Sequence, residues 1–132
     1  YCMEGELVAK FGIKICELET SKVYLFKEQS HPGRCIVAHK KHVGDMNELT
    51  AEERAAYFED VARVARAIMK AFNPDKVNYG AYGDTGHHLH FHLCPKYKDE
   101  YEWGGVFLMN PDKKYLTDEE YAAMIEKIKA NL

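Results

Sequence analysis

The chain has 132 residues, the length of one ordinary domain, and residues 1–132 are expected to fold around one core that buries roughly two-thirds of the unfolded surface. Its formal net charge is −3, with Lys and Arg interspersed among Asp and Glu, which argues against a broad basic surface for bulk nucleic acid. No apolar run approaches the roughly 20 residues of a membrane-spanning helix and no leader-like segment is evident, so we expect a cytoplasmic protein that makes no membrane contact.

Five stretches rich in Val, Ile, Tyr, Phe and Leu predict β-strands, which span residues 13–19, 22–28, 33–39, 76–82 and 87–94. Between the third and fourth strands, apolar residues recur at helical spacing from Thr50 to Phe72, after a capping box that begins at Thr50. A second capping box, at Thr117, opens a terminal helix that packs either on the sheet or on a partner. This order predicts an α+β fold with a mainly antiparallel sheet of about five strands. One face of the sheet is covered by the long helix, and the other is free to carry a site.

Three histidines alternate along the last predicted strand, at His88, His90 and His92. Successive side chains of a strand point to opposite faces, so the three imidazoles share one face and the apolar residues between them share the other. A lone histidine on a half-buried strand is usually structural. A row of three is a costly way to build a core, because every ring nitrogen taken out of water needs a partner. The row therefore indicates chemistry.

The central imidazole, His90, has a histidine on each side and is best placed to attack phosphorus, provided that one ring nitrogen is unprotonated and a hydrogen bond fixes the other. The flanking rings then contact phosphate oxygens or assist the leaving group. Just before the row, the segment from Asn78 to Gly86 contains three glycines and Thr85. Small residues let backbone amides approach an anion, so this segment is either a phosphate cradle or an ordinary glycine-bearing turn.

The run from His88 to Pro95 resembles the signature of the histidine triad (HIT) family, in which three histidines alternate with apolar residues. The upstream run from Gly33 to Val43 is similar to that family's second landmark, a buried strand that leads into a basic turn. The resemblance spans roughly residues 20–96. It implies a homodimeric α+β nucleotide hydrolase or transferase that acts on the α-phosphate of nucleoside phosphoramidates or dinucleoside polyphosphates and needs no cofactor for catalysis.

The resemblance also implies a role for each histidine of the triad. The middle histidine of the family becomes transiently nucleotidylated, which here is His90. The first orients it through its backbone, which matches His88. The third binds phosphate or assists the leaving group, which matches His92.

Four further residues are implied as substrate-binding. Thr85 stands three residues before the triad, where a family Ser or Thr touches phosphate. Asn78 matches an amide residue that lines the same pocket, and Glu28 matches an acidic residue that meets the ribose hydroxyls. Asp84 stands where a Gln commonly precedes the Ser or Thr.

The chain departs from the family pattern at other positions. Arg34 replaces a common histidine, and both Arg34 and Asp84 are expected to alter the choice of substrate. His39 replaces the usual Pro of the turn. Lys96 replaces an Arg and keeps the cation, but it loses the planar fork that grips phosphate at two points.

Some members of the family carry a structural zinc. Here Cys2, His42 and His88 match three of its ligands, and the fourth has no counterpart in the sequence. The alternative is that Cys2 is a loose terminal thiol and His42 a surface turn residue.

Two other functions compete with the nucleotidyl enzyme. A His-x-His strand also supplies two ligands in metal-dependent hydrolases, although that chemistry needs a further ligand. The other is a nucleotide-binding module without turnover, which would be expected to lack the middle histidine, and His90 is present.

Overall fold

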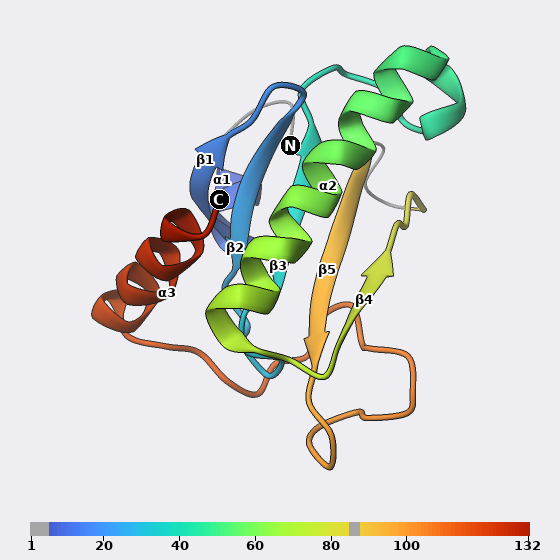
Figure 1. The fold of residues 1–132 in the computed structure, drawn as a ribbon. Coiled ribbons are helices and arrows are strands. Elements are labelled where there is room, and N and C mark those ends of the chain that lie inside the picture. Colours follow the sequence, from blue (N-terminus) through green and yellow to red (C-terminus); the bar gives the residue numbers. More distant parts are fainter. Residues whose placement is uncertain (1–5, 85–87) are drawn as a thin grey trace.

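The structure is a computed structural model and describes residues 6–84 and 88–132. In chain order these residues form α1 (Glu6–Phe11), β1 (Gly12–Glu17), β2 (Ser21–Phe26), β3 (Cys35–His39), the 3₁₀ helix η1 (Met46–Glu48), α2 (Ala51–Phe72), β4 (Lys76–Gly80), β5 (His90–Lys96) and α3 (Asp118–Ala130). Figure 1 shows the strands as one sheet with α2 lying across it. The predicted α+β architecture is confirmed.

All strand pairs in the sheet are antiparallel, and the strand order is β1-β2-β3-β5-β4. β5 therefore lies between β3 and β4. His90 pairs with Ala38 of β3, and His92 pairs with Ile36 of β3 and with Gly80 of β4. Directly opposite residues of an antiparallel pair point to the same face of the sheet. The register thus fixes which side chains surround the two histidines of β5.

The sequence supplies a capping residue at each end of the long helix α2, which satisfies backbone groups that have no partner within the helix. The Thr50 hydroxyl accepts from the Glu53 amide at 3.1 Å, and the Glu53 carboxylate accepts from the Thr50 amide at 2.8 Å. The helix ends at Asn73, which is left-handed at φ 51°. Its apolar face packs on one face of the sheet and forms the main core. The helix contributes Tyr57, Val61, Val64 and Ile68, and the sheet side contributes Val23, Leu25, Val37, Leu89 and Leu93.

The terminal helix α3 packs on its own chain, beside α2 and the β1 edge of the sheet (Figure 1). Tyr121 and Ile128 of α3 are buried in the main core. The capping box that was predicted from Thr117 is formed with Glu120. The terminal helix was predicted to pack either on the sheet or on a partner, and the structure shows it packed against its own sheet and α2.

The other face of the sheet is covered as well, which corrects the prediction of a free face. Tyr24, Phe26, Ile36 and Ala38 form a second buried cluster there, and α1 lies on this side (Figure 1). The segment of residues 97–117, which we call the strap, also reaches it, because the Phe107 ring lies 6.4 Å from the His92 ring. The histidine side chains are thus buried under this layer of the protein, next to a pocket described below.

The predicted strands and the two longer helices agree with the structure, with different ends. β5 begins at His90 rather than at residue 87, so His88 precedes the strand instead of lying on it. The backbone of Leu89 still hydrogen-bonds to the end of β3, since its carbonyl accepts from the His39 amide at 3.0 Å. The short helices α1 and η1 were not predicted, because six and three residues are too few to show helical periodicity.

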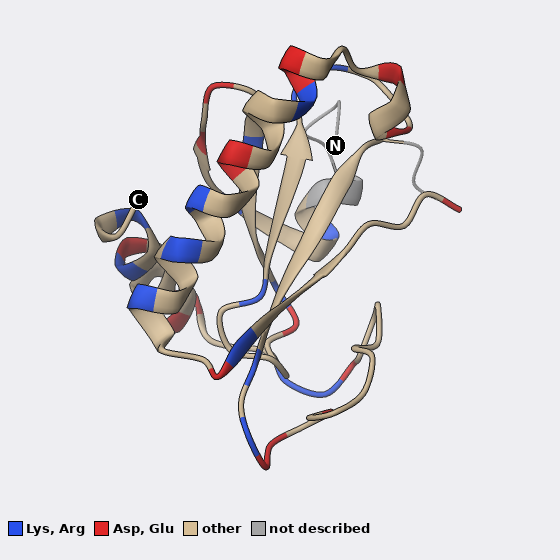
Figure 2. Cartoon of the chain, turned by 45° about the vertical axis from the view of Figure 1, so that its right-hand side comes forward, with Lys and Arg blue, Asp and Glu red and all other residues tan. Residues whose placement is uncertain are grey.

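Charged residues of both signs are spread along α2 and over the loops rather than gathered in one patch (Figure 2). This distribution agrees with the interspersed charges of the sequence and its net charge of −3. Among the residues that the structure describes, no helix is both long and apolar enough to cross a membrane.

Candidate functional site

The central histidine, His90, opens β5 and faces away from α2. Its Nδ1 lies 2.7 Å from the backbone carbonyl oxygen of His88. A carbonyl oxygen can only accept, so Nδ1 carries the proton and the lone pair of the neutral ring is on Nε2. Burial lowers the pKa of His90, although the hydrogen bond to His88 acts in the opposite direction. His90 is thus a neutral imidazole whose nucleophilic nitrogen is Nε2.

The first histidine of the triad holds the backbone that His90 contacts. The His88 side chain is buried, and its Nε2 donates to the backbone carbonyl of His39 at the end of β3. This bond ties His88 to the sheet while its own carbonyl accepts from His90. The arrangement fits the orienting role that the family resemblance implies for His88.

The third histidine, His92, is only 2% exposed. Its ring centroid lies 5.2 Å from that of His90 and 5.6 Å from that of Phe26. The Nη2 atom of Arg34 lies 3.0 Å from His92 Nδ1. Burial, followed by the charge of Arg34, lowers the pKa of His92 to about 2. His92 therefore stays uncharged at neutral pH.

Arg34 is fully buried beside the triad, with an exposed fraction of 0%. Its guanidinium carbon lies 4.0 Å from the centre of the Phe26 ring and 4.9 Å from that of Phe107. The residue before it, Gly33, has φ +94°, and a Cβ there would lie 2.6 Å from the Phe72 ring. Glycine is thus needed at this turn, which directs Arg34 toward the histidine face of the sheet.

A second glycine makes room beside His92. Gly80 pairs with His92, and a Cβ on it would lie 2.7 Å from the Tyr82 ring and 2.8 Å from the Phe107 ring. The two aromatic rings pack edge to face with their centroids 6.4 Å apart. Because Gly80 has no side chain, Phe107 of the strap reaches the sheet next to the triad.

Buried charged side chains hold the strap against the sheet. Arg34 donates to the carbonyls of Leu108 and Met109, at 3.0 and 2.9 Å. Lys96, which is 2% exposed, donates to the carbonyls of Glu102 and Gly105, at 2.7 and 2.6 Å. Lys96 stands where the family resemblance places an arginine for phosphate, and in this structure its amine binds the strap.

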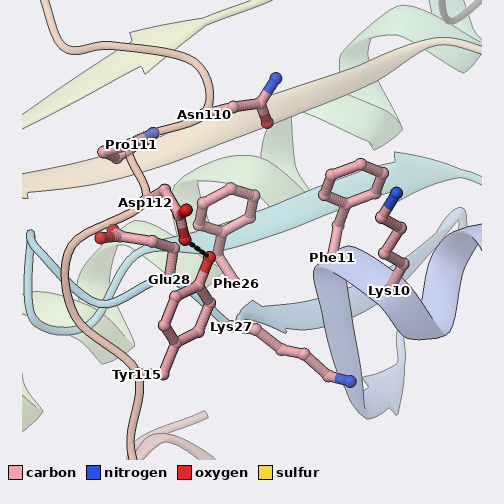
Figure 3. Close-up of a pocket in the computed structure, with 9 residues that line it drawn as sticks. All are labelled: Lys10, Phe11, Phe26, Lys27, Glu28, Asn110, Pro111, Asp112 and Tyr115. Atoms are coloured by element: carbon pink, nitrogen blue, oxygen red, sulfur yellow. Dashed lines mark hydrogen bonds between the residues drawn. The ribbon is translucent and has the colours of Figure 1, made fainter.

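A pocket of about 250 Å³ lies next to the triad, on the α1 side (Figure 3). In Figure 3, Phe26 lies between Phe11, from the end of α1, and the residues of the strap. Phe26 joins the pocket to the site, because its ring also contacts His92. The pocket is lined by Lys10, Phe11, Phe26, Lys27, Glu28, Asn110, Pro111, Asp112 and Tyr115.

Glu28, the predicted ribose ligand, lines this pocket but is already engaged within the chain. Its carboxylate accepts from the amide and hydroxyl of Ser30, at 2.9 and 2.6 Å, and from the amides of Lys113 and Lys114, at 2.9 and 2.8 Å. Burial raises the pKa of Glu28, but these hydrogen bonds outweigh burial and the pKa is lowered. Glu28 therefore stays ionised and anchors the strap, and its contact with ribose remains a prediction.

Two of the other predicted substrate residues, Asn78 and Asp84, lie on β4 or in the loop that follows it. Asn78 pairs with Cys94 of β5, which places it on the same face of the sheet as His92. Asp84 is exposed in the loop that follows β4. Thr85 lies outside the described residues, so its predicted contact with phosphate stays a prediction.

The predicted zinc set is only partly described. The rings of His42 and His88 are neighbours, with centroids 5.8 Å apart, whereas Cys2 lies outside the described residues. Within residues 6–84 and 88–132, no three His, Cys, Asp or Glu side chains are grouped to hold a metal ion. Zinc binding by Cys2, His42 and His88 therefore stays a prediction.

Sequence reasoning marked Arg34 as a departure from the family but did not pair it with His92. It also missed Phe107 and the aromatic pocket around Phe26. The signal for Arg34 was a basic residue directly after a glycine, at the entry to an apolar strand. Phe107 carried no signal of its own, because its position depends on the path of the strap.

Comparison with known proteins agrees with this geometry. Residues 12–99 match the model of the HIT domain. The chain is 28% identical over 127 residues to adenosine 5'-monophosphoramidase hnt1 of Schizosaccharomyces pombe, which covers 91% of this chain and 88% of the relative. It is 30% identical over 123 residues to protein hit of Bacillus subtilis, which covers 85% of both chains. Its fold is similar to that of a histidine triad protein from Sinorhizobium meliloti, with a TM-score of 0.90 at 24% identity, covering 98% of this chain and 96% of the other.

Proposed function

Because the chain belongs to the HIT domain family, we propose that it is a nucleotide hydrolase or transferase that forms a nucleotidyl intermediate on His90. The observation that carries this proposal is the 2.7 Å hydrogen bond from His90 Nδ1 to the His88 carbonyl, which leaves the lone pair of the ring on Nε2. The proposed substrates are nucleoside phosphoramidates or dinucleoside polyphosphates. The relative from Schizosaccharomyces pombe, named as an adenosine 5'-monophosphoramidase, supports this class.

The reaction proceeds in two displacements at the α-phosphorus. In the first, His90 Nε2 forms a bond to phosphorus while the bond to the leaving group breaks, and the electron pair of that bond departs with the leaving group. In the second, a water oxygen or another acceptor attacks the same phosphorus, loses a proton, and releases His90 as a neutral imidazole. Hydrogen-bond donors around the phosphoryl oxygens stabilise the charge that develops in both steps.

The pocket beside Phe26 is proposed to hold the nucleoside part of the substrate. Phe11 and Phe26 supply apolar ring surfaces, and the backbone of the strap closes the opposite side (Figure 3). Its volume of about 250 Å³ is below the roughly 300–1,000 Å³ of pockets that bury a drug-sized ligand, so it suits part of a nucleotide rather than the whole. The phosphate end then lies toward His92, which contacts Phe26.

A trapping experiment tests the intermediate directly. The protein is mixed with adenosine 5'-phosphoramidate or with diadenosine triphosphate, quenched in base, and analysed by mass spectrometry of the intact chain and of its peptides. We expect an adenylyl adduct on the peptide that contains His90, and no adduct in the His90→Asn variant. An active enzyme whose adduct maps to another residue, or that forms none under single-turnover conditions, would contradict the proposal.

The same preparation separates the two competing functions. Turnover that persists in excess EDTA, together with the His90 adduct, argues against a metal-dependent hydrolase. Loss of turnover in EDTA, restored by Zn²⁺, would favour that hydrolase. AMP binding without turnover of either substrate would favour a nucleotide-binding module.

The homodimer implied by the family is also a proposal. The strap exposes Val106 at 79%, Leu108 at 56% and Tyr115 at 58%, so it offers apolar surface to a second copy. Sedimentation equilibrium measures the mass of the assembly, and a monomer at micromolar concentration would contradict this proposal.

A further inference from the structure

The strongest feature outside the triad itself is the position of Arg34. A guanidinium that is fully buried has lost its hydration, so its N–H groups must find acceptors inside the protein. Two of these acceptors are the carbonyls of Leu108 and Met109 on the strap, and a third is Nδ1 of His92 at 3.0 Å. The aromatic rings of Phe26 and Phe107 flank the guanidinium and hold it in place.

The bond to His92 has only one possible direction. Arginine stays protonated in proteins and has no acceptor, so the guanidinium donates and His92 Nδ1 accepts. A neutral imidazole that accepts at Nδ1 carries its proton on Nε2. Among the described residues, Arg34 and then His90 act on His92 electrostatically, and both disfavour a second proton on its ring.

We propose that Arg34 is a positioning and specificity residue that keeps His92 as the neutral Nε2–H tautomer, and that this favours substrates whose leaving group departs as a phosphate rather than as an amine. The inference rests on the proposed function and narrows its substrate class. In it, His92 donates a hydrogen bond from Nε2 to the substrate and does not act as a cationic acid.

The preference follows from proton balance. When the bond from the α-phosphorus to a bridging oxygen breaks, the electron pair departs on a phosphate oxygen, which is stable as an anion near neutral pH. When a phosphorus–nitrogen bond breaks, the departing nitrogen needs a proton to leave as an amine. A neutral His92 would become an imidazolate if it gave up its Nε2 proton, so that proton has to come from solvent or from the substrate itself.

The tautomer is tested by nuclear magnetic resonance of protein labelled with ¹⁵N-histidine, with the His92 signals assigned by their loss in His92→Gln. We expect His92 to show a protonated Nε2 and an unprotonated Nδ1, with no titration between about pH 5 and about pH 8. A His92 ring that carries its proton on Nδ1, or that titrates in this range, would overturn the proposal. This readout does not depend on any enzymatic activity.

Variants then separate Arg34 from the strap that it also holds. Arg34→Met removes the donor and the charge, and we expect the His92 ring to begin titrating and to populate both tautomers. Arg34→Lys keeps a cation and is expected to restore part of the original spectrum. If Arg34→Met does not fold, the wild-type spectrum of His92 still tests the tautomer. The matched control is Lys96→Met, which removes another buried strap anchor, whose amine donates to the carbonyls of Glu102 and Gly105. If Lys96→Met changes the His92 spectrum as Arg34→Met does, strap order and not Arg34 sets the tautomer.

Leaving-group preference is measured as the ratio of kcat/KM for diadenosine triphosphate to kcat/KM for adenosine 5'-phosphoramidate. We expect the wild-type protein to favour the polyphosphate, and Arg34→Met to lower this ratio on the order of tenfold, because His92 can then be protonated and assist an amine. An unchanged ratio in a folded Arg34→Met protein, or a wild-type preference for the phosphoramidate, would refute the specificity claim. If the wild-type protein turns over neither substrate, the proposed function and the leaving-group preference fail together, while the tautomer remains readable.

Discussion

The rings of His90 and His92 lie 5.2 Å apart and carry their protons on opposite nitrogens. His90 donates from Nδ1 to a backbone carbonyl, whereas His92 accepts at Nδ1 from Arg34. Two chemically identical side chains, two residues apart on one strand, therefore present a lone pair at one Nε2 and an N–H at the other. The difference arises from their hydrogen-bond partners, because both rings are buried.

Replacement of the central histidine tests the nucleophile. We expect His90→Asn to lower kcat by about 10³-fold or more, because the covalent path is lost, while the far-ultraviolet circular dichroism and the melting temperature stay close to those of the wild type. Steady-state kinetics with each substrate measures the effect. Wild-type turnover by the purified variant would remove His90 from its assigned role.

Acid is expected to destabilise the protein through His92. The pKa of His92 is about 2 in the folded chain and 6.5 for the unperturbed group, so between these values the unfolded state binds the additional proton. Above pH 6.5 the protein keeps the full contribution of neutral His92 to the free energy of unfolding. Below pH 6.5 that free energy falls by about 1.4 kcal/mol for each pH unit. Urea unfolding at about pH 7 and about pH 5 measures the slope. The slope should be smaller in His92→Gln, and an equal slope in both proteins would contradict the prediction.

The orientation of the residues between the histidines is tested by a buried charge. Leu89 is 5% exposed and belongs to the core beneath α2. We expect Leu89→Asp to lower the free energy of unfolding by about 3 kcal/mol or more, since the carboxylate would be buried without a partner. The matched control is Ala55→Asp at an exposed position of α2, where little change is expected. Similar unfolding curves for the two variants would show that the sheet faces are assigned wrongly.

Glu28 anchors the strap and is predicted to contact ribose. Measuring stability and substrate binding on the same variant separates these two roles. Glu28→Gln has one carbonyl oxygen, so its NH₂ group must face either the Ser30 amide or the amides of the strap. We expect a loss of about 1–3 kcal/mol in the free energy of unfolding. Asp112→Asn is the control, because that exposed carboxylate of the same pocket accepts from the Tyr115 hydroxyl, whose bond an amide oxygen can also accept. A higher KM with unchanged stability in Glu28→Gln would instead assign Glu28 to the substrate alone.

The architecture was predictable because its signals are local. Alternation along residues 87–94 predicted which side chains of β5 meet α2, and the structure places Leu89 and Leu93 in that core. Helical spacing after Thr50 predicted α2, and its capping box is formed as expected. Both patterns repeat over enough residues for periodicity to identify the element.

The partners within the site were not predictable in the same way. The pairing of Arg34 with His92 joins residues 58 positions apart, and Glu28 meets the Lys113 and Lys114 amides 85 and 86 positions away. No local pattern encodes such contacts, because they depend on how the strap crosses the sheet. The start of β5 also differed from the prediction. The strand begins at His90, and His88, whose ring bonds with the His39 carbonyl, lies two residues before it.

The anchoring of the strap has a consequence for protein engineering. The carbonyls of Leu108 and Met109 share the Arg34 guanidinium with an imidazole of the triad. A chimera that imports the C-terminal third from a relative keeps these acceptors only if the imported backbone crosses the sheet along the same path, so that its carbonyls meet the guanidinium. The two parts of the chain are therefore one unit for recombination, although more than 60 residues separate them along the sequence.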